Sequence, residues 1–469
     1  LGLRENLNLT SEWQQIVRPF LATETVDGNV RLCFKFGGSE AGIALADVVL
    51  QEGAVLKGLP AGQSLEDKNI SLPSSGFSAA AKGDAQRFLE DTEKAFLADM
   101  VHFLKEELEV KVPITASQVN YHGTKIAAAH CEYTDIHTYW QHPHFPGRSW
   151  DPGNWVVKNI PMEQTPCTDK MSYLSTMRLL DRPYTVSEWM IPNPNDFSAS
   201  AVPFAALYAA MQDWDGVFFF QYHDQHDNWN VEGPHNFFSL AGQPAKLALL
   251  GVGANIFCRG DLAPVQNQLA GTLEERVSGA LSFSSRIGID PALETPNNTP
   301  VQEGNLLMTP DQSVIWDASQ PETARLILNT PATKGMFGLT ANSSFYFGNM
   351  RVTVGETDRQ YACMFVTSKD GKPISQSHQL LLIAVGRAEN QGMGWNENRD
   401  SVGRNWGTPP VMVNGIAADF TFERMVKALY VLDSTGQRQT QVEISQEDGI
   451  SRWHIGPEHQ TLWYEIVLE

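Results

Sequence analysis

The sequence predicts an α/β fold over residues 1–265, followed by an all-β region over residues 266–469. The first part contains apolar strand candidates that alternate with helix candidates, which is the order typical of parallel α/β proteins. The second part contains short stretches of alternating polarity separated by turn residues, as in β-sandwiches. A chain of 469 residues is long enough for two or three domains. We expect one or two sandwiches in the second part, as separate subdomains.

The α/β part begins clearly at Asp84, which is a candidate N-cap. From there to Leu108, apolar residues return at helical spacing, so we expect an amphipathic helix. A short strand is expected at residues 112–116. Three longer strand candidates and two helix candidates follow. The first strand candidate is β-branched and aromatic, and the third is a nearly continuous apolar run, as expected of a strand covered on both faces. The strands are expected at residues 133–140, 184–189 and 216–222, and the helices at 201–213 and 243–257.

The all-β part is predicted from short segments in which apolar and polar residues alternate. Turn residues such as Lys369-Asp370-Gly371-Lys372 and Ser434-Thr435-Gly436 separate them. The strand candidates are residues 324–328, 350–354, 361–367, 380–385 and 462–468.

Composition limits the classes of function. The hydrophobic content is 42% and the net charge is −20, so a nucleic acid, whose phosphates would be repelled, is not an expected partner. No apolar stretch reaches the roughly 18 residues that cross a bilayer, so we expect no membrane segment. The five cysteines are scattered without a CxxC pair, which argues against a zinc ribbon. No export signal is recognisable, although a secreted or periplasmic location would suit the expected substrate.

Glu188 is the residue around which the chain is organised. It ends the strand candidate that begins at Tyr184 and is followed by the polar loop starting at Met190. In parallel α/β barrels, catalytic residues lie at the C-terminal ends of strands. A carboxylate beside aromatic rings is what a retaining glycosidase needs as its nucleophile. The alternative interpretation is that Glu188 is only a polar strand end.

Aromatic and histidine side chains are concentrated in the segments beside Glu188, where they could bind a sugar. Tryptophan faces stack on sugar rings. For each tryptophan taken alone a core position is the safer interpretation, but Trp140, Trp150, Trp155 and Trp229 together, in loops near Glu188, favour a binding cleft. His223, Asp224, His226 and Asp227 could instead bind a metal, but we interpret this stretch as a solvated loop and expect no metal or organic cofactor. The candidate substrate-binding residues here are His137, Tyr139, Trp140, Trp150, Trp155, Tyr222 and His223.

Residues 84–262 resemble the large clan of retaining glycoside hydrolases with a (β/α)8 barrel, in particular cellulase-like members that carry C-terminal β domains. The resemblance implies that Glu188, in Ser187-Glu188-Trp189, is the nucleophile at the end of the seventh strand. It implies that His137 and Tyr139, at the end of the sixth strand, orient it. The acid/base of the clan is a Glu at the end of the fourth strand. Its counterpart here would be Glu5, followed by Asn6, but Arg4 stands where the clan has Asn.

The same resemblance implies a fold in which residues 1–265 are the C-terminal part of a (β/α)8 TIM barrel, strands four to eight. The first three strands would precede residue 1, so we expect the chain to be a fragment of a longer protein. The expected activity is that of a retaining β-glycoside hydrolase acting on an oligo- or polysaccharide by double displacement. The alternative is a non-catalytic carbohydrate-binding protein that keeps the cleft but lacks a working acid/base.

Overall fold

The computed structural model describes residues 5–18, 20, 32–35, 42–50, 62–72, 79–116, 123–225, 227–297 and 304–469. The chain divides into two compact units, Leu1–Leu108 and Glu109–Glu469. In the first, the helix α1 (Ala79–His102) continues into the short π-helix η1 (Phe103–Glu107), and the described residues before α1 form neither helix nor strand. The helix expected from Asp84 is therefore present, but Asp84 lies inside it and does not cap it.

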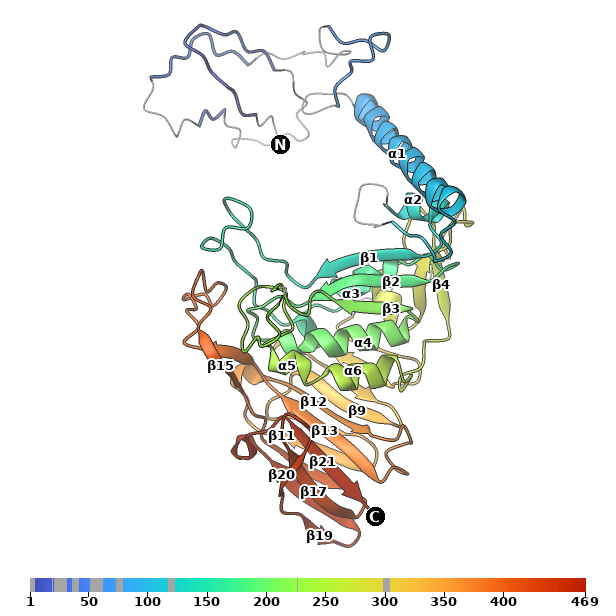
Figure 1. Ribbon diagram of the computed structural model, residues 1–469, viewed down its shortest axis with the longest axis vertical. Helices are drawn as coiled ribbons and strands as arrows, with labels where there is room; N and C mark the ends of the chain where they lie inside the picture. Colours follow the sequence, from blue (N-terminus) through green and yellow to red (C-terminus); the bar gives the residue numbers. More distant parts are fainter. Residues whose placement is uncertain are drawn as a thin grey trace. The chain divides into compact units, whose positions relative to one another are not determined.

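The second unit contains a parallel sheet of three strands, β1 (Thr134–Tyr139), β2 (Tyr184–Met190) and β3 (Gly216–Phe219), in that order (Figure 1). These three strands lie where the sequence predicts them. The strand expected at residues 112–116 is absent, and that described segment is irregular. The helices of this part are α2 (Gly123–His130), α3 (Lys170–Met177), α4 (Ala201–Met211), α5 (Pro244–Leu247) and α6 (Leu250–Phe257).

Two antiparallel sheets account for most of the remaining chain. The nine-stranded sheet has the order β18 (Arg438–Gln441), β17 (Val426–Leu432), β21 (Trp463–Leu468), β13 (Gln379–Val385), β12 (Tyr361–Ser368), β9 (Thr333–Leu339), β8 (Arg325–Asn329), β7 (Val314–Asp317), β6 (Leu306–Met308). The five-stranded sheet has the order β10 (Ser344–Tyr346), β11 (Met350–Val354), β16 (Ala418–Phe422), β20 (Ile450–Ile455), β19 (Ser445–Glu447). Two strand pairs complete the described unit: β4 (Gln268–Gly271) with β5 (Arg286–Ile289), and β14 (Ala388–Gln391) with β15 (Thr408–Val413).

The expected TIM barrel is wrong. In the described residues the parallel sheet that contains Glu188 stops at three strands, and the unit is dominated by the nine-stranded antiparallel sheet. The physical reason is that the helices after β2 and β3 pack on that antiparallel sheet. The helix α6 lies beside β9 and β12 (Figure 1), and Phe204 of α4 contacts Phe337 of β9. A strand–helix–strand order specifies parallel pairing locally, but it does not specify how many strands join or what covers the helices.

A single hydrophobic core joins the parallel sheet to the nine-stranded sheet. It includes Val186 and Trp189 of β2, Phe204 of α4, and Phe337 and Phe365 of the nine-stranded sheet, all buried. This core crosses residue 265, where a division between 1–265 and 266–469 was expected. That division stays a prediction.

The opposite face of the nine-stranded sheet packs on the five-stranded sheet. The strand β12 shows why both faces are covered: Cys363 and Phe365 belong to the core with the helices, whereas Met364 and Val366 belong to the core between the two sheets. Side chains alternate across a strand, so a strand that is apolar at every position can fill two cores at once. In the described part of the chain, no helix combines the length and apolar character needed to span a membrane.

Candidate functional site

The face of the parallel sheet opposite the helices is polar. In β2, Tyr184 and Val186 point into the core, so Thr185 and Ser187 lie on the other face. Both donate hydrogen bonds to Asp135 of β1, from Thr185 Oγ1 to Oδ2 at 2.5 Å and from Ser187 Oγ to Oδ1 at 2.6 Å. These bonds hold the two strands together across the polar face.

Glu188 lies directly beyond these bonds, at the C-terminal end of β2. The register between β1 and β2 shifts here, because Ile136 pairs with Val186 whereas His137 pairs with Glu188, leaving Ser187 as an extra residue in β2. Such a bulge redirects the following side chain. It brings Glu188 beside Tyr139, whose hydroxyl donates a hydrogen bond to Glu188 Oε2.

Tyr139 remains a hydrogen-bond donor over the ordinary pH range. Burial, followed by the hydrogen bond to Glu188 and the charge of that carboxylate, raises the pKa of Tyr139 far above its usual value. A phenol that keeps its proton can stabilise a carboxylate, because hydrogen bonds to an ionised acceptor are the stronger kind. Tyr139 therefore holds one carboxylate oxygen of Glu188 with a hydrogen bond whose donor keeps its proton.

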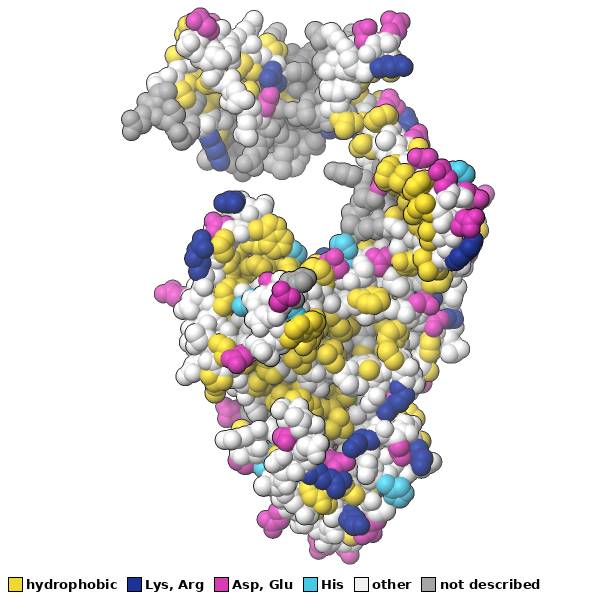
Figure 2. Space-filling model, in the orientation of Figure 1, with side chains coloured by type: hydrophobic (Ala, Val, Ile, Leu, Met, Phe, Trp, Pro, Cys, Tyr) yellow, Lys and Arg dark blue, Asp and Glu magenta, His cyan; other side chains and the backbone are white. Residues whose placement is uncertain are grey.

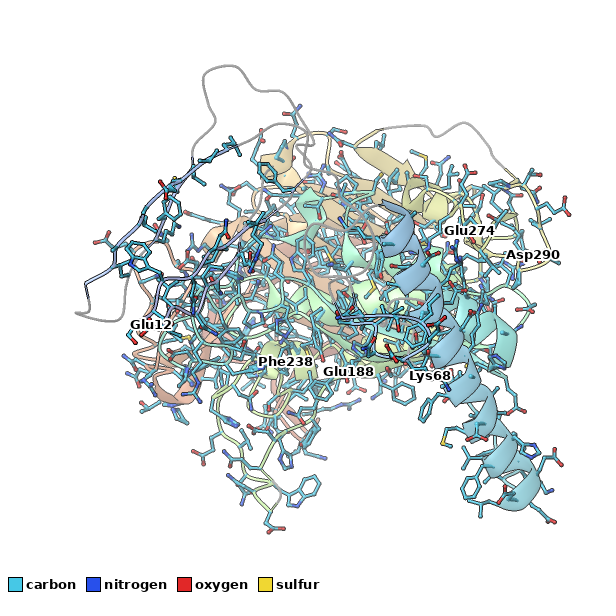
Figure 3. The ribbon with its side chains drawn as sticks, turned by 90° about the horizontal axis from the view of Figure 1, so that it is seen from above. Glu12, Lys68, Glu188, Phe238, Glu274 and Asp290 are labelled. Carbon is cyan, nitrogen blue, oxygen red and sulfur yellow. The ribbon has the colours of Figure 1, made fainter. Side chains whose placement is uncertain are left out.

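Six aromatic rings extend from this pair into the loops, and we call them the aromatic wall. They are Tyr139, His142, Phe145, Trp150, Phe237 and Phe238. The ring of Tyr139 lies 4.6 Å from that of Phe238, and His142 lies 5.5 Å from Trp150, as measured between centroids. Figure 3 labels Glu188 and Phe238, which lie near each other in that view. The aromatic wall thus begins beside Glu188, the candidate nucleophile.

Trp150 is the exposed end of the aromatic wall. Its side chain is 58% exposed and its backbone has a positive φ of 60°. Trp155 is 2% exposed and Trp140 is 7% exposed. Trp155 packs in a small core with Val157 and Val402, and Trp140 belongs to the main core. We expected all three to bind sugar, but in this structure only Trp150 presents a ring to solvent.

A second aromatic group follows β3. Tyr222 and Trp229 are exposed, their rings lie 6.1 Å apart, and His223 lies 5.0 Å from Trp229. The segment is anchored at Gln221, which donates to Phe238 O at 2.9 Å and accepts from Leu240 N at 2.8 Å. Figure 2 shows hydrophobic side chains gathered over the loops that follow β1 and β3. Both groups flank the strand that carries Glu188.

Sequence reasoning missed Phe237 and Phe238, whose rings pack against Tyr139 and Trp150. Two consecutive phenylalanines directly after the stretch Gly233-Pro234-His235-Asn236 were a detectable signal, because apolar rings in a loop need a partner. Their partners are supplied by the loop after β1, which is distant in sequence.

Glu5 and Asn6 belong to the first unit, whereas Glu188 belongs to the second. No strand includes Glu5 in the described residues, and residues 1–4, where a strand end was expected, lie outside them. Glu5 accepts a hydrogen bond from Arg18 at 2.5 Å, and that bond lowers the pKa of Glu5. A general acid needs the opposite, a pKa raised toward the working pH. The environment of Glu5 therefore favours the ionised form.

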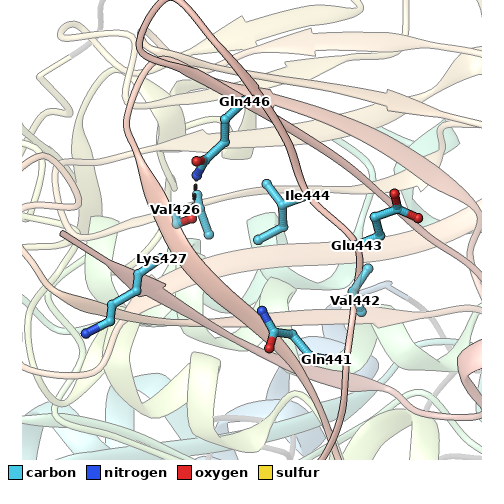
Figure 4. Close-up of a pocket in the computed structure, with 7 residues that line it drawn as sticks. All are labelled: Val426, Lys427, Gln441, Val442, Glu443, Ile444 and Gln446. Carbon is cyan, nitrogen blue, oxygen red and sulfur yellow. Dashed lines mark hydrogen bonds between the residues drawn. The ribbon is translucent and has the colours of Figure 1, made fainter.

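The described residues contain no group of three or more His, Cys, Asp or Glu side chains arranged to hold a metal ion, and His226 lies outside them. Asp224 instead pairs with His235 at 2.7 Å. A separate open hollow lies on the β-sandwich (Figure 4). Its lining is Val426, Lys427, Gln441, Val442, Glu443, Ile444 and Gln446, without an aromatic ring. That hollow offers no stacking surface for a sugar.

No protein-family model matches the chain, and no curated protein was found to match it.

The two tryptophans of the loop after β1 should respond differently to replacement. Trp150→Ala removes an exposed ring, so we expect weaker binding of oligosaccharides and a change in unfolding free energy within about 0.5 kcal/mol. Trp155→Ala empties a buried site and should cost about 3–5 kcal/mol of stability. Calorimetric titration and urea unfolding of both variants measure the two effects. Equal losses of stability would contradict the difference in burial.

Proposed function

We propose that the second unit binds a carbohydrate at the C-terminal end of β1–β3 and that Glu188 is the nucleophile of a retaining β-glycoside hydrolase. The observation that carries the proposal is the hydrogen bond from Tyr139 to Glu188 at the start of an aromatic wall. In this mechanism a carboxylate attacks the anomeric carbon while the glycosidic C–O bond breaks and a general acid protonates the departing oxygen. Water then hydrolyses the covalent glycosyl-enzyme and releases the carboxylate. Aromatic rings bind the apolar faces of sugar rings.

Each described group has a task in this proposal. One oxygen of Glu188 is held by Tyr139, which leaves the other oxygen to form the bond to carbon. The hydroxyl of Tyr139 keeps the carboxylate oriented in the free protein. Exposed rings such as Trp150 and Trp229 provide stacking surfaces on the two neighbouring loops. The second carboxyl group of a retaining pair should lie about 5–5.5 Å from the nucleophile, and Glu5 is the sequence-based candidate.

A second function, non-catalytic carbohydrate binding, is favoured by one observation. Glu5 is held ionised by Arg18, which opposes its use as a general acid. A chain with the aromatic wall but without an acid/base would bind sugars and leave them intact. The two functions share the aromatic wall and differ in whether Glu188 forms a covalent bond.

A mechanism-based label separates the two functions. Incubation with a 2-deoxy-2-fluoro glycoside that carries a good leaving group bypasses much of the need for an acid and traps the glycosyl-enzyme. We expect peptide mass spectrometry to find the adduct on Glu188. An adduct on another carboxylate would contradict the assignment of the nucleophile. Binding of cello-oligosaccharides without any adduct would favour the binding function.

A further inference from the structure

Lys246, on the short helix α5, carries an amine that the proposed chemistry does not use. Its side chain is 0% exposed. Its Nζ donates to Ile191 O at 2.7 Å, to Asn193 Oδ1 at 2.8 Å and to Met190 Sδ at 3.4 Å. The acceptors are Met190, the last residue of β2, and two residues of the segment that follows β2.

Lys246 makes no ion pair with a carboxylate within the residues that the structure describes. Burial lowers its pKa to about 7, as expected when an ammonium group is taken out of water. Burying an amine without a counter-charge costs stability, and its three hydrogen bonds offset part of that cost. Those bonds fix the position of the exit of β2, by which we mean the C-terminal end of this strand and the residues that follow it.

Asn193 extends the same network to the aromatic wall. Its backbone N–H donates to Phe237 O at 2.6 Å, and its Nδ2 donates to Ser239 O at 3.0 Å. Its Oδ1 accepts from Lys246 and from Gln243 Nε2 at 3.2 Å. Asn193 is completely buried. It therefore connects the exit of β2 to the segment that carries Phe237 and Phe238.

We propose that Lys246 is a positioning residue that, through Asn193, keeps the exit of β2 and the Phe237–Phe238 segment in one fixed geometry, so that Glu188 and the aromatic wall act together on a sugar. This inference builds on the proposed function. The β2 exit is also held by its two neighbouring strands, since Trp140 N donates to Met190 O at 3.0 Å and Phe220 N to Trp189 O at 3.2 Å. From the exit of β2, Asn193 bonds to the segment at 236–239, which Gln221 after β3 also holds through its bond to Phe238 O.

The test replaces Lys246 by methionine, which has a similar length and no donor, and uses Lys372→Met as the exposed control. Asn193→Ala breaks the same link from the other end. In the full chain, hydrogen exchange measured by mass spectrometry should become at least tenfold faster in peptides covering 190–197 and 236–241 in both variants. Exchange in β12 should remain as in the unchanged protein. The control Lys372→Met should leave hydrogen exchange unchanged in the two peptides and in β12.

A sugar-dependent measurement accompanies the exchange experiment. In Lys246→Met, the rate at which the fluoro glycoside labels Glu188 should fall about 10- to 100-fold, because small misplacements of reacting groups have effects of that size. The double variant should lose little more than either single variant, since both break one link. Additive losses in the double variant would overturn the proposal.

The exchange and labelling results distinguish the two proposals. Faster hydrogen exchange in both peptides of the variants supports the positioning role, whether or not the fluoro glycoside labels Glu188. An unchanged protein that takes no label would contradict only the glycosidase proposal. Unchanged exchange at 236–241 in Lys246→Met overturns the positioning role, whatever the labelling shows. A general loss of protection that includes β12 would mean that Lys246 stabilises the whole core, and this outcome also overturns it.

Discussion

Replacing Glu188 by glutamine should abolish at least 99.9% of the activity on aryl β-glycosides, a loss of about 4 kcal/mol or more in transition-state stabilisation. The substitution preserves the size of the side chain and the acceptor for Tyr139. It removes the negative charge and the nucleophilic oxygen, without which the covalent intermediate does not form. Steady-state kinetics on 4-nitrophenyl glycosides measures the loss.

The matched control for Glu188→Gln is Glu356→Gln, which changes an exposed glutamate on the β-sandwich part of the chain. It should leave kcat/KM within twofold of the unchanged protein. Tyr139→Phe should fall between the two, because the carboxylate remains but loses its donor. Activity in Glu188→Gln above about a tenth of the original would exclude Glu188 as the nucleophile.

The second large effect concerns Glu163, a carboxyl group buried between the helices and the nine-stranded sheet. Its side chain is 0% exposed, Ser200 donates a hydrogen bond to Oε1, and Oε2 has no hydrogen-bond partner in the described residues. Burial raises the pKa of Glu163 to about 7. The protonated form is therefore favoured in the fold at pH values where the unfolded chain has lost the proton.

The sign of the pH effect follows from this shift. A carboxyl group whose pKa rises on folding contributes stability that is fully present below its unfolded pKa and is lost as the pH rises through about 7. Between pH 5 and pH 8 the loss should amount to about 2–3 kcal/mol. Glu163→Gln, which is neutral at every pH, should remove this part of the pH dependence and make the protein more stable than the original at pH 8.

Urea unfolding of the full chain at pH 5, 6, 7 and 8 measures the difference between the two proteins. Asp169, whose pKa burial raises to about 6, contributes in the same direction and is common to both. Lys246, with a pKa lowered to about 7, acts in the opposite direction above pH 7, so the comparison ends at pH 8. Identical pH profiles for Glu163→Gln and the original protein would show that Glu163 is not the titrating group.

Much of the secondary structure could be predicted from the sequence. The strands containing Glu188, His137 and Phe218 and the helix at Ala201 are present where they were expected. Local periodicity and runs of β-branched and aromatic residues determine these elements, and both signals depend only on residues a few positions apart. The helix expected over residues 243–257 is instead two helices, α5 and α6.

The candidate site could be predicted only in part. Glu188 and Tyr139 were named together, and a hydrogen bond joins them. Trp155 was placed in the cleft, but it is buried against Phe237 and Trp406, at centroid distances of 4.8 and 5.8 Å. A tryptophan in a loop has the same sequence signature whether its ring faces solvent or another loop, and the loop at 393–406 that covers Trp155 is more than 200 residues away in the chain.

The sequence by itself determined the local elements, their parallel or alternating character, and the carboxylate at the end of β2. The tertiary structure alone decided that the helices after β2 and β3 cover a nine-stranded antiparallel sheet and do not complete a barrel. It alone decided which tryptophan is exposed and that Lys246 and Asn193 are buried behind the site. The physical reason is that hydrophobic burial is non-directional: an apolar helix face specifies that it must be covered, and only the packing of distant segments specifies by what.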